Sequence, residues 1–363
     1  MSTRDRRAGV WDEADAPVPA ARLLAIAARG YGGLLGVRDL LYARGVLASR
    51  ALDRPVVSVG NLILGGTGKT PAVELAVRTL ADLGHRPAVL SRGYGRRSRG
   101  VQIVADTASI RLDAEEGGDE PFLLARRLPG VPVVVGANRY DAARLAIERF
   151  GVSALVLDDG FQHRTLRKDL EIVMARAARP WGNGRLLPGG PLREPLSALA
   201  RADLVVATGA RRVEDAVEVL EAVRRWAPAL PVLVAAHVPT ECWEWSTMRA
   251  VPLSALRGAS ALAFAGIGSP GGFRRTLDEV GARVADFVTF GDHHWYSRAD
   301  LATLEARAAA LGVDGLVTTE KDWVRLRRRP PLRRPVWVLG VRLALLSGEA
   351  EWRSTFQRTC PRA

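Results

Sequence analysis

The sequence predicts an α/β protein whose main domain is a doubly wound, mostly parallel sheet of the P-loop NTPase type. A glycine-rich turn separates an apolar strand from a helical segment, short apolar strands then alternate with helical stretches, and two consecutive aspartates follow one strand. Regular alternation of this kind requires parallel crossovers, and ligands of such sheets bind at the carboxyl ends of the strands. With 363 residues, 48% of them hydrophobic, the chain is long enough for two domains.

The N-terminal segment, residues 20–51, is apolar but interrupted by arginines. No uncharged apolar run in it reaches the roughly 18 residues that a membrane-spanning helix needs. It predicts an interfacial helix or helix pair, apolar on one face, with a break at the glycines near residue 32. A helix packed on the protein's own core fits the periodicity equally well. The residues concerned are Arg22, Arg29, Arg38, Arg44 and Arg50 on the polar side and Gly30, Gly32 and Gly33 at the break.

The next element is an apolar strand at residues 55–59, which leads into Gly-Gly-Thr-Gly-Lys-Thr at residues 65–70 and then into a helix. In this pattern backbone N–H groups bind phosphates, Lys69 reaches the β/γ oxygens, and the Thr70 hydroxyl is placed to ligate Mg²⁺. The usual pattern has glycine at position 63, where this chain has Ile63. The residues expected to bind nucleotide are Ile63, Leu64, Gly65, Gly66, Thr67, Gly68, Lys69 and Thr70.

Further apolar strands are predicted at residues 87–90, 131–135, 154–157 and 204–207, and a helix at residues 140–150. The third of these strands ends on Asp158 and Asp159, an acidic pair that could hold Mg²⁺ opposite the threonine of the phosphate loop. The alternative is that these aspartates only cap a turn. Asp119 and Glu120 precede a helical stretch and, taken alone, are more typical of a helix N-terminus than of a catalytic base.

The net charge indicates the kind of partner that the protein binds, and the cysteine content indicates the cellular compartment. The net charge of +13, from 52 Lys and Arg against 39 Asp and Glu, indicates an anionic partner: nucleic acid, anionic lipid or a phosphorylated substrate. An arginine-rich composition bias would produce the same balance. Two cysteines, Cys242 and Cys360, are too few for a disulfide framework, which favours a reducing compartment, by default the cytosol.

Eight sequence blocks, in order, resemble the tetraacyldisaccharide 4'-kinase family over about residues 20–326. They are residues 60–62, 65–71, 91–95, 118–121, 158–163, 187–195, 291–294 and 318–322. The family phosphorylates the 4'-hydroxyl of a lipid A precursor, a tetraacyldisaccharide 1-phosphate, using ATP and Mg²⁺ at the cytoplasmic face of the inner membrane. The resemblance therefore implies a peripheral membrane enzyme with an acylated disaccharide 1-phosphate as substrate and no nucleic-acid partner.

The resemblance also implies a domain organisation, with a nucleotide in the cleft between a P-loop core and a smaller C-terminal α/β domain. We expect a membrane-associated segment at residues 1–50, the kinase core at 51–234, a linker at 235–252, the C-terminal domain at 253–345 and a tail at 346–363. Trp243 and Trp245 lie in the expected linker, where periodicity is low.

Site roles follow from the family's motifs, position by position. Asp119 is the candidate catalytic base, assisted by His293, with His294 as the alternative, and Lys69 contacts the phosphates. The carboxylates expected at the Mg²⁺ site are Asp158, Asp159 and Glu194, next to Thr70. The residues expected to face substrate or phosphate are Arg92, Tyr94, Gln162 and Arg193.

Two other classes of function remain possible. A P-loop ATPase or GTPase acting on nucleic acid would also be basic, but the chain lacks interleaved aromatic and basic residues and a recognised docking helix. Its nearest match to the guanine-reading Asn-Lys-x-Asp pattern is residues 320–322, which have Glu in place of Asn and the aspartate one position early. A nucleotide-gated membrane adaptor would keep the same phosphate loop without phosphorylating an acceptor.

Overall fold

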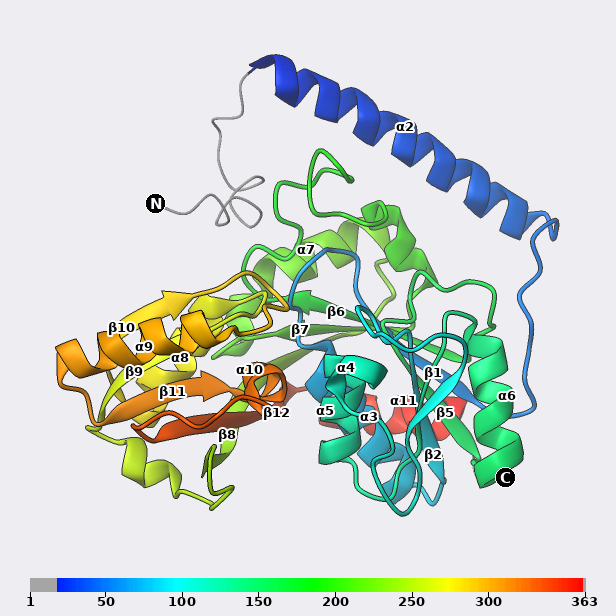
Figure 1. Cartoon of the computed structure of the whole chain (residues 1–363). Coiled ribbons are helices and arrows are strands. Elements are labelled where there is room, and N and C mark those ends of the chain that lie inside the picture. Colours follow the sequence, from blue (N-terminus) through cyan, green and yellow to red (C-terminus); the bar gives the residue numbers. More distant parts are fainter. Residues whose placement is uncertain (1–17, 362–363) are drawn as a thin grey trace. The chain divides into compact units, whose positions relative to one another are not determined.

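The computed structural model describes residues 18–361 and confirms the predicted fold class (Figure 1). Two compact α/β units are present: a P-loop unit, described over residues 18–236 and 345–361, and a second unit at residues 237–344. The chain passes from one unit to the other within strand β8 (Val232–Glu244) and returns within strand β12 (Val336–Ser347). Residues 1–17 of the predicted N-terminal segment and 362–363 of the predicted tail lie outside the described residues.

The sheet of the P-loop unit has the strand order β8-β7-β6-β1-β5-β2-β4-β3. Neighbouring strands are parallel, except that β3 runs antiparallel to β4. The remaining strands are β1 (Val56–Gly60), β2 (Pro87–Ser91), β3 (Gln102–Ala105), β4 (Val133–Val135), β5 (Ala154–Asp158), β6 (Leu170–Arg176) and β7 (Leu204–Thr208). Every residue of β1, β2, β4, β5 and β7 is buried, as expected for parallel strands covered on both faces.

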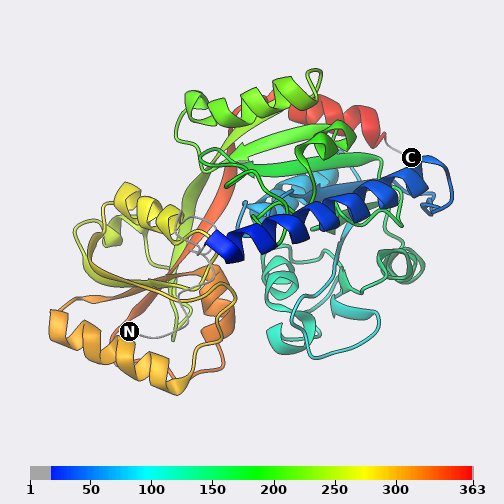
Figure 2. The same ribbon diagram turned by 90° about the horizontal axis from the view of Figure 1, so that it is seen from above.

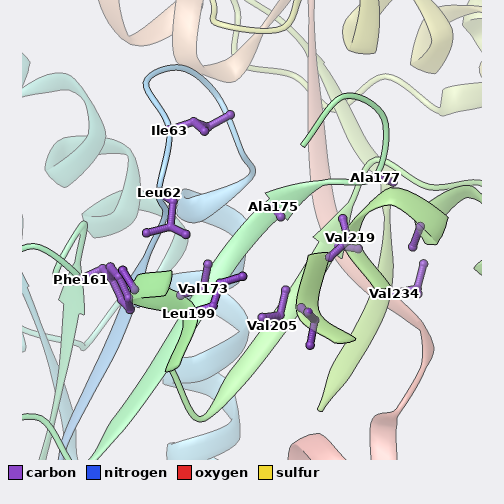
Figure 3. Close-up of a cluster of buried hydrophobic side chains, with 14 of the residues drawn as sticks. Leu62, Ile63, Phe161, Val173, Ala175, Ala177, Leu199, Val205, Val219 and Val234 are labelled. Atoms are coloured by element: carbon purple, nitrogen blue, oxygen red, sulfur yellow. The ribbon is translucent and has the colours of Figure 1, made fainter. Parts of the chain in front are cut away.

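Helices follow the strands in alternation. They are α2 (Val18–Ala43), α3 (Lys69–Asp82), α4 (Ala114–Gly117), α5 (Asp119–Arg127), α6 (Arg139–Phe150), α7 (Val217–Trp226) and α11 (Glu349–Thr359), with 3-10 turns η1 (Leu196–Arg201) and η2 (Val213–Ala216). Alanines of α6 pack against one set of residues from β1, β2, β4 and β5. A second cluster joins β6, β7, β8 and α7 to Leu62 and Ile63 at the start of the phosphate loop (Figure 3). The loop is thereby fixed to the core.

The second unit is a smaller parallel sheet with the strand order β10-β9-β11-β12. Its other elements are β9 (Ser260–Ala265), β10 (Arg283–Thr289), β11 (Gly315–Thr319), η3 (Leu253–Leu256), α8 (Pro270–Val280), α9 (Arg298–Leu311) and α10 (Glu320–Leu326). Phe273 and Leu277 of α8 pack with alanines of β9 to form its core. Where the sequence predicts a low-periodicity linker, the chain forms most of β8, and Trp243 and Trp245 are buried.

The expected tail contributes to the P-loop unit. Within it, α11 buries Trp352 and Phe356, and the Trp352 indole N–H donates to Thr79 Oγ1 of α3 over 2.9 Å. Cys360, just after the helix, is also buried, and its carbonyl oxygen lies 3.0 Å from His85 Nε2. These contacts hold the C-terminal segment against the unit that contains the phosphate loop.

The predicted break at Gly30, Gly32 and Gly33 is wrong, because α2 is one continuous helix of 26 residues (Figure 2). Glycine costs a helix only about 1 kcal/mol per residue, which packing can offset, whereas proline would interrupt the hydrogen bonding. One of these glycines has a packing reason. A Cβ on Gly32 would lie 3.0 Å from Leu186 Cδ1, so the helix approaches residues 186–189 closely at that point.

Gly60, the last residue of β1, provides a test of this packing. A Cβ there would lie 2.5 Å from Phe161 Cβ and 2.7 Å from the Phe161 nitrogen, so Gly60→Ala must displace backbone. We expect it to lower the free energy of unfolding by about 1–3 kcal/mol, measured as a shift of the urea midpoint. Gly33→Ala is the control, because a Cβ at that position on α2 would meet no described residue within 4 Å apart from its chain neighbours and the backbone of the helix itself. Equal midpoints for both variants would contradict this packing.

Candidate active site

The candidate site lies at the carboxyl ends of three adjacent parallel strands of the P-loop unit. Strand β5 pairs with β1 on one side and with β2 on the other, and the predicted site segments follow these strands. The phosphate loop follows β1, Asp159 follows β5, and Arg92 follows β2. Parallel strands bring their carboxyl ends to the same edge, which is where doubly wound sheets bind their ligands.

The phosphate loop is held by side chains on both of its flanks. Asn61 Nδ2 donates to Thr67 Oγ1 over 3.0 Å, and Thr208 Oγ1 at the end of β7 donates to the Thr67 carbonyl over 2.9 Å. Gly68 adopts φ 80°, a left-handed conformation that glycine accommodates without strain, directly before α3 begins at Lys69. Backbone N–H groups at this helix start suit an anion.

Ile63 has a structural role at the position where the usual pattern has glycine. Its side chain is buried with Leu62 (Figure 3), while the Leu64 nitrogen donates to the Pro191 carbonyl over 2.9 Å. The Arg193 nitrogen donates in turn to the Leu62 carbonyl over 2.7 Å. This pairing places the predicted substrate-facing residue Arg193 beside the phosphate loop.

Asp159 connects the loop after β5 to two cations. It has φ 53°, in the left-handed region that few residues other than glycine adopt. Its carboxylate lies 3.5 Å from Lys69 Nζ and accepts from Arg193 Nη1 at 2.8 and 3.0 Å. Burial alone would raise the pKa of Asp159, but Lys69 and Arg193 outweigh it and lower the pKa. Gln162 joins the group through Arg193 Nη1, 3.4 Å from its Oε1.

The pKa of Asp158 is shifted in the opposite direction to that of Asp159. It is 1% exposed, and burial, followed by the nearby charges of Glu120 and Asp159, raises its pKa to about 7. Ser91 Oγ donates to its Oδ2 over 3.1 Å, whereas Oδ1 is buried with no hydrogen-bond partner among the described residues. A buried carboxylate oxygen without a donor fits a divalent cation, which would replace the missing donor and offset the clustered negative charge.

Glu120 is a site residue that the sequence reasoning did not select. Its Oε1 lies 3.4 Å from Thr70 Oγ1, and its charge contributes to the raised pKa of Asp158. The neighbouring Asp119 is the first residue of α5, and its Oδ1 accepts from the Glu120 nitrogen over 2.9 Å. The sequence did contain a signal for Glu120, namely its position next to Asp119 at a helix start, where both acidic side chains can face one site.

The loop with Arg92 and Tyr94 packs against the start of α5. Gly118 has φ 98°, a conformation that favours glycine, and a Cβ there would lie only 3.2 Å from Gly93 Cα, so the two backbones approach closely at this point. Arg92 and Tyr94 flank this contact, and both side chains are exposed. The structure thus brings together three of the predicted residues, Arg92, Tyr94 and Asp119, at one edge of the sheet.

Glu194, one of the expected Mg²⁺ carboxylates, is buried and paired with two arginines. It is 1% exposed, and its two carboxylate oxygens accept from different arginines, Oε1 from Arg38 at 2.8 Å and Oε2 from Arg201 at 2.5 Å. The two guanidinium groups thus offset the cost of burying this negative charge. The expected Mg²⁺ role of Glu194 stays a prediction, and in this structure the carboxylate forms an ion pair with the two arginines.

Two further basic residues close to the acidic pair, Arg139 and His163, were also not selected from the sequence. Arg139, the first residue of α6, is buried, and burial lowers its pKa although Asp158 opposes this. His163 has its pKa lowered to about 4 by burial and then by Arg139, Lys168 and Arg92. The signal for Arg139 was its place just after β4, at the same sheet edge as the phosphate loop.

His293 and His294 belong to the second unit and differ in their surroundings. His294 Nε2 lies 3.0 Å from Asp300 Oδ2, and its ring stacks on Phe290 at a centroid distance of 4.7 Å. His293 is half-buried and has φ 59°, the same left-handed conformation as Asp159. Asp322 is a structural centre that accepts from the Gly266 nitrogen and the Tyr296 hydroxyl, both at 2.8 Å, which accounts for residues 320–322 without guanine recognition.

Comparison with known proteins gives one family for nearly the whole chain. The family model described as tetraacyldisaccharide-1-P 4'-kinase matches residues 20–360. A tetraacyldisaccharide 4'-kinase of Syntrophus aciditrophicus (strain SB) is 42% identical over 94% of this chain and 95% of its own length. One of Anaeromyxobacter dehalogenans (strain 2CP-C) is 45% identical over 87% of this chain and 84% of its own.

A solved structure supports the same conclusion. The crystal structure described as the "apo" form of LpxK from Aquifex aeolicus in complex with ATP superimposes with a TM-score of 0.73 and 31% identity, over 94% of this chain and 99% of that chain. The phosphate loop, the acidic pair after β5 and the segment at residues 187–195 form one site within this fold. The chain belongs to the tetraacyldisaccharide 4'-kinases, the ATP-dependent kinases of lipid A biosynthesis.

Proposed function

We propose that the P-loop unit transfers the γ-phosphate of ATP to the 4'-hydroxyl of tetraacyldisaccharide 1-phosphate, with separate residues for the nucleotide, the metal and the proton. One observation carries the proposal: Thr70 Oγ1 and Glu120 Oε1 are 3.4 Å apart, which brings the phosphate loop to the residue beside Asp119. The rival functions, a nucleic-acid ATPase or GTPase and a membrane adaptor, are not favoured, because the whole-chain relatives are named as kinases.

Residues 63–70 bind the nucleotide phosphates through backbone N–H groups, and Lys69 faces the β/γ oxygens. Thr70 and Asp158 would hold Mg²⁺, with Asp159 alongside. When bound, Mg²⁺ neutralises charge on the phosphate oxygens. Support comes from Asp158 Oδ1, which lacks a hydrogen-bond donor among residues 18–361, and from the pairing of Asp159 with Lys69, which keeps that lysine directed at the site.

Asp119 acts as the general base in an in-line displacement. The 4'-oxygen forms a bond to the γ-phosphorus, the bond from the γ-phosphorus to the β-γ bridging oxygen breaks, and the hydroxyl proton passes to the Asp119 carboxylate. His293 assists Asp119. The engagement of His294 with Asp300 supports His293 as the assisting residue. Arg92, Tyr94, Gln162 and Arg193 bind the acceptor or the transferred phosphate.

The enzyme works as a peripheral protein at the cytoplasmic face of the inner membrane, through the outward face of α2. Within residues 18–361, no helix combines the length and hydropathy needed to cross a membrane. Apolar side chains nevertheless line the outward face, among them Leu23 and Leu34, which are 68% and 71% exposed. Arg29 on this helix is exposed and supplies a positive charge for anionic headgroups.

The raised pKa of Asp158 predicts a pH-dependent stability. The folded protein keeps the Asp158 proton up to a pKa of about 7, whereas the unfolded chain releases it near 3.8. The folded state therefore binds more protons in this window, and the free energy of unfolding of the metal-free protein falls as pH rises through it. Mg²⁺ must displace that proton, so stabilisation by Mg²⁺ with a non-hydrolysable ATP analogue should be larger at about pH 8 than at about pH 6.

Thermal melts at the two pH values, with and without the ligands, measure both effects. Asp158→Asn should abolish the pH dependence of the Mg²⁺ shift. Asp53→Asn, at an exposed aspartate, should leave that dependence unchanged. A parental pH dependence in Asp158→Asn would remove Asp158 from the metal site.

The proposed base predicts a selective loss of turnover. Asp119→Asn keeps the size of the side chain but cannot accept the proton, so kcat should fall by about 10²–10⁴ while ATP binding changes little. Asp113→Asn, in the preceding turn, is the matched control, because asparagine caps a helix as well as aspartate does. His293→Ala should alter the acid limb of the kcat pH profile. Intact single-turnover chemistry with weakened Mg·ATP binding in Asp119→Asn would instead make Asp119 a metal-site residue.

The outward face of α2 predicts the membrane affinity. Replacing Leu23, Ile26, Leu34 and Val37 by Ser should lower binding to anionic lipid vesicles by at least about 10-fold, because each buried side chain contributes on the order of 1 kcal/mol or more. Flotation with vesicles measures it. The control substitutes four exposed apolar residues elsewhere, Val213, Val217, Leu311 and Leu346. Unchanged flotation of the α2 variant would place the anchor in another segment.

A further inference from the structure

Helix α2 carries polar residues on its inward face that contact one short segment of the P-loop unit. The Tyr31 hydroxyl donates to the Arg193 carbonyl over 2.9 Å, and Arg38 Nη2 donates to Glu194 Oε1 over 2.8 Å. These contacts span more than 150 residues of sequence yet reach two consecutive positions. Membrane binding would not account for every arginine of this helix, because the Arg38 side chain points away from the exposed face and contacts Glu194.

The Glu194 ion pair is a strong constraint on that segment. Its carboxylate is almost fully buried and is neutralised from two sides, by Arg38 of α2 and by Arg201 of η1. Arg201 is itself held over the Phe161 ring at 4.6 Å. A buried carboxylate that loses one of two partners is strongly destabilised where it lies, so the segment around it would move.

The segment leads directly to the proposed phosphate site. Arg193 precedes Glu194, its main-chain nitrogen donates to the Leu62 carbonyl, and its guanidinium contacts both oxygens of Asp159. Asp159 in turn lies 3.5 Å from Lys69. An unbroken series of hydrogen bonds and ion pairs therefore runs from α2 through residues 193–194 to the phosphate loop.

We propose that Tyr31 and Arg38 of α2 are positioning residues for Arg193, so that the helix whose outer face meets the membrane also holds part of the active site in place. Tyr31 fixes the Arg193 carbonyl, and Arg38 fixes the adjacent Glu194. Together they set the direction from which the Arg193 guanidinium reaches Asp159. The inference rests on the proposed contact of Arg193 with substrate or phosphate.

The test is a double-mutant cycle between α2 and Arg193. Arg38→Ala, Tyr31→Phe and Arg193→Ala are each made alone, and each α2 change is combined with Arg193→Ala. Turnover is measured in mixed detergent micelles at saturating acceptor and ATP, so that membrane binding does not limit the rate. Arg44→Ala, at an exposed arginine directly after the helix, is the control and should keep parental kcat.

We expect Arg38→Ala to lower kcat by about 10- to 100-fold, since small misplacements of positioned groups have effects of that size, and Tyr31→Phe by a smaller factor. In the Arg193→Ala background neither change should lower kcat further, because the residue they position is gone. Vesicle flotation of Arg38→Ala should match the parent, since this side chain is on the inward face.

The results distinguish a failure of the proposed role of Arg193 from a failure of the positioning proposal for Tyr31 and Arg38. Parental kcat in Arg193→Ala would refute the proposed role of Arg193 itself. A loss in Arg193→Ala with parental kcat in Arg38→Ala and Tyr31→Phe would overturn the positioning proposal, as would losses that multiply in the double variants. If Arg38→Ala fails to fold, Tyr31→Phe decides, because it removes a single oxygen and leaves the ion pair intact.

Discussion

The placement of buried negative charge beside the phosphate loop is the constraint on which the site depends. Asp158 and Asp159 are consecutive, yet Lys69 and Arg193 lower the pKa of one against its burial, while burial and Glu120 raise the pKa of the other. The left-handed turn at Asp159 directs the two carboxylates to different partners. The Asp159 carboxylate therefore pairs with Lys69 and Arg193. Asp158 keeps a buried oxygen without a donor, which suits a metal cation from solution.

Arginines organise this site as much as the carboxylates do. Arg193 and Arg201 pair with acidic residues inside the P-loop unit, and Arg38 pairs with Glu194 from α2. Part of the strongly basic composition is thus used within the fold, where planar guanidinium groups can bind carboxylates from a fixed direction. Other arginines, including Arg29 on α2, are exposed at the surface.

Helix α2 combines two surfaces that an isolated helix would not need. Its inward side makes close contacts at Gly32 and polar contacts through Tyr31 and Arg38, and its outward side exposes large apolar residues. The two interpretations that periodicity allowed, a membrane-facing helix and a helix packed on the core, are therefore compatible. The inward face packs on the P-loop unit, and the membrane-facing role of the outward face stays a prediction.

The sequence alone was sufficient for the P-loop sheet, the phosphate loop, the acidic pair and the family, because these depend on local patterns: an apolar strand, a glycine turn and a helix start. It could not predict the ion pair of Glu194 with Arg38, because the two residues are more than 150 positions apart in the chain. Nor could it select Glu120 or Arg139, which become site residues only when neighbouring strands align their carboxyl ends. The continuity of α2 was likewise decided by tertiary packing, since the local cost of its glycines favoured a break and only the contact with residues 186–189 explains why one of them is there.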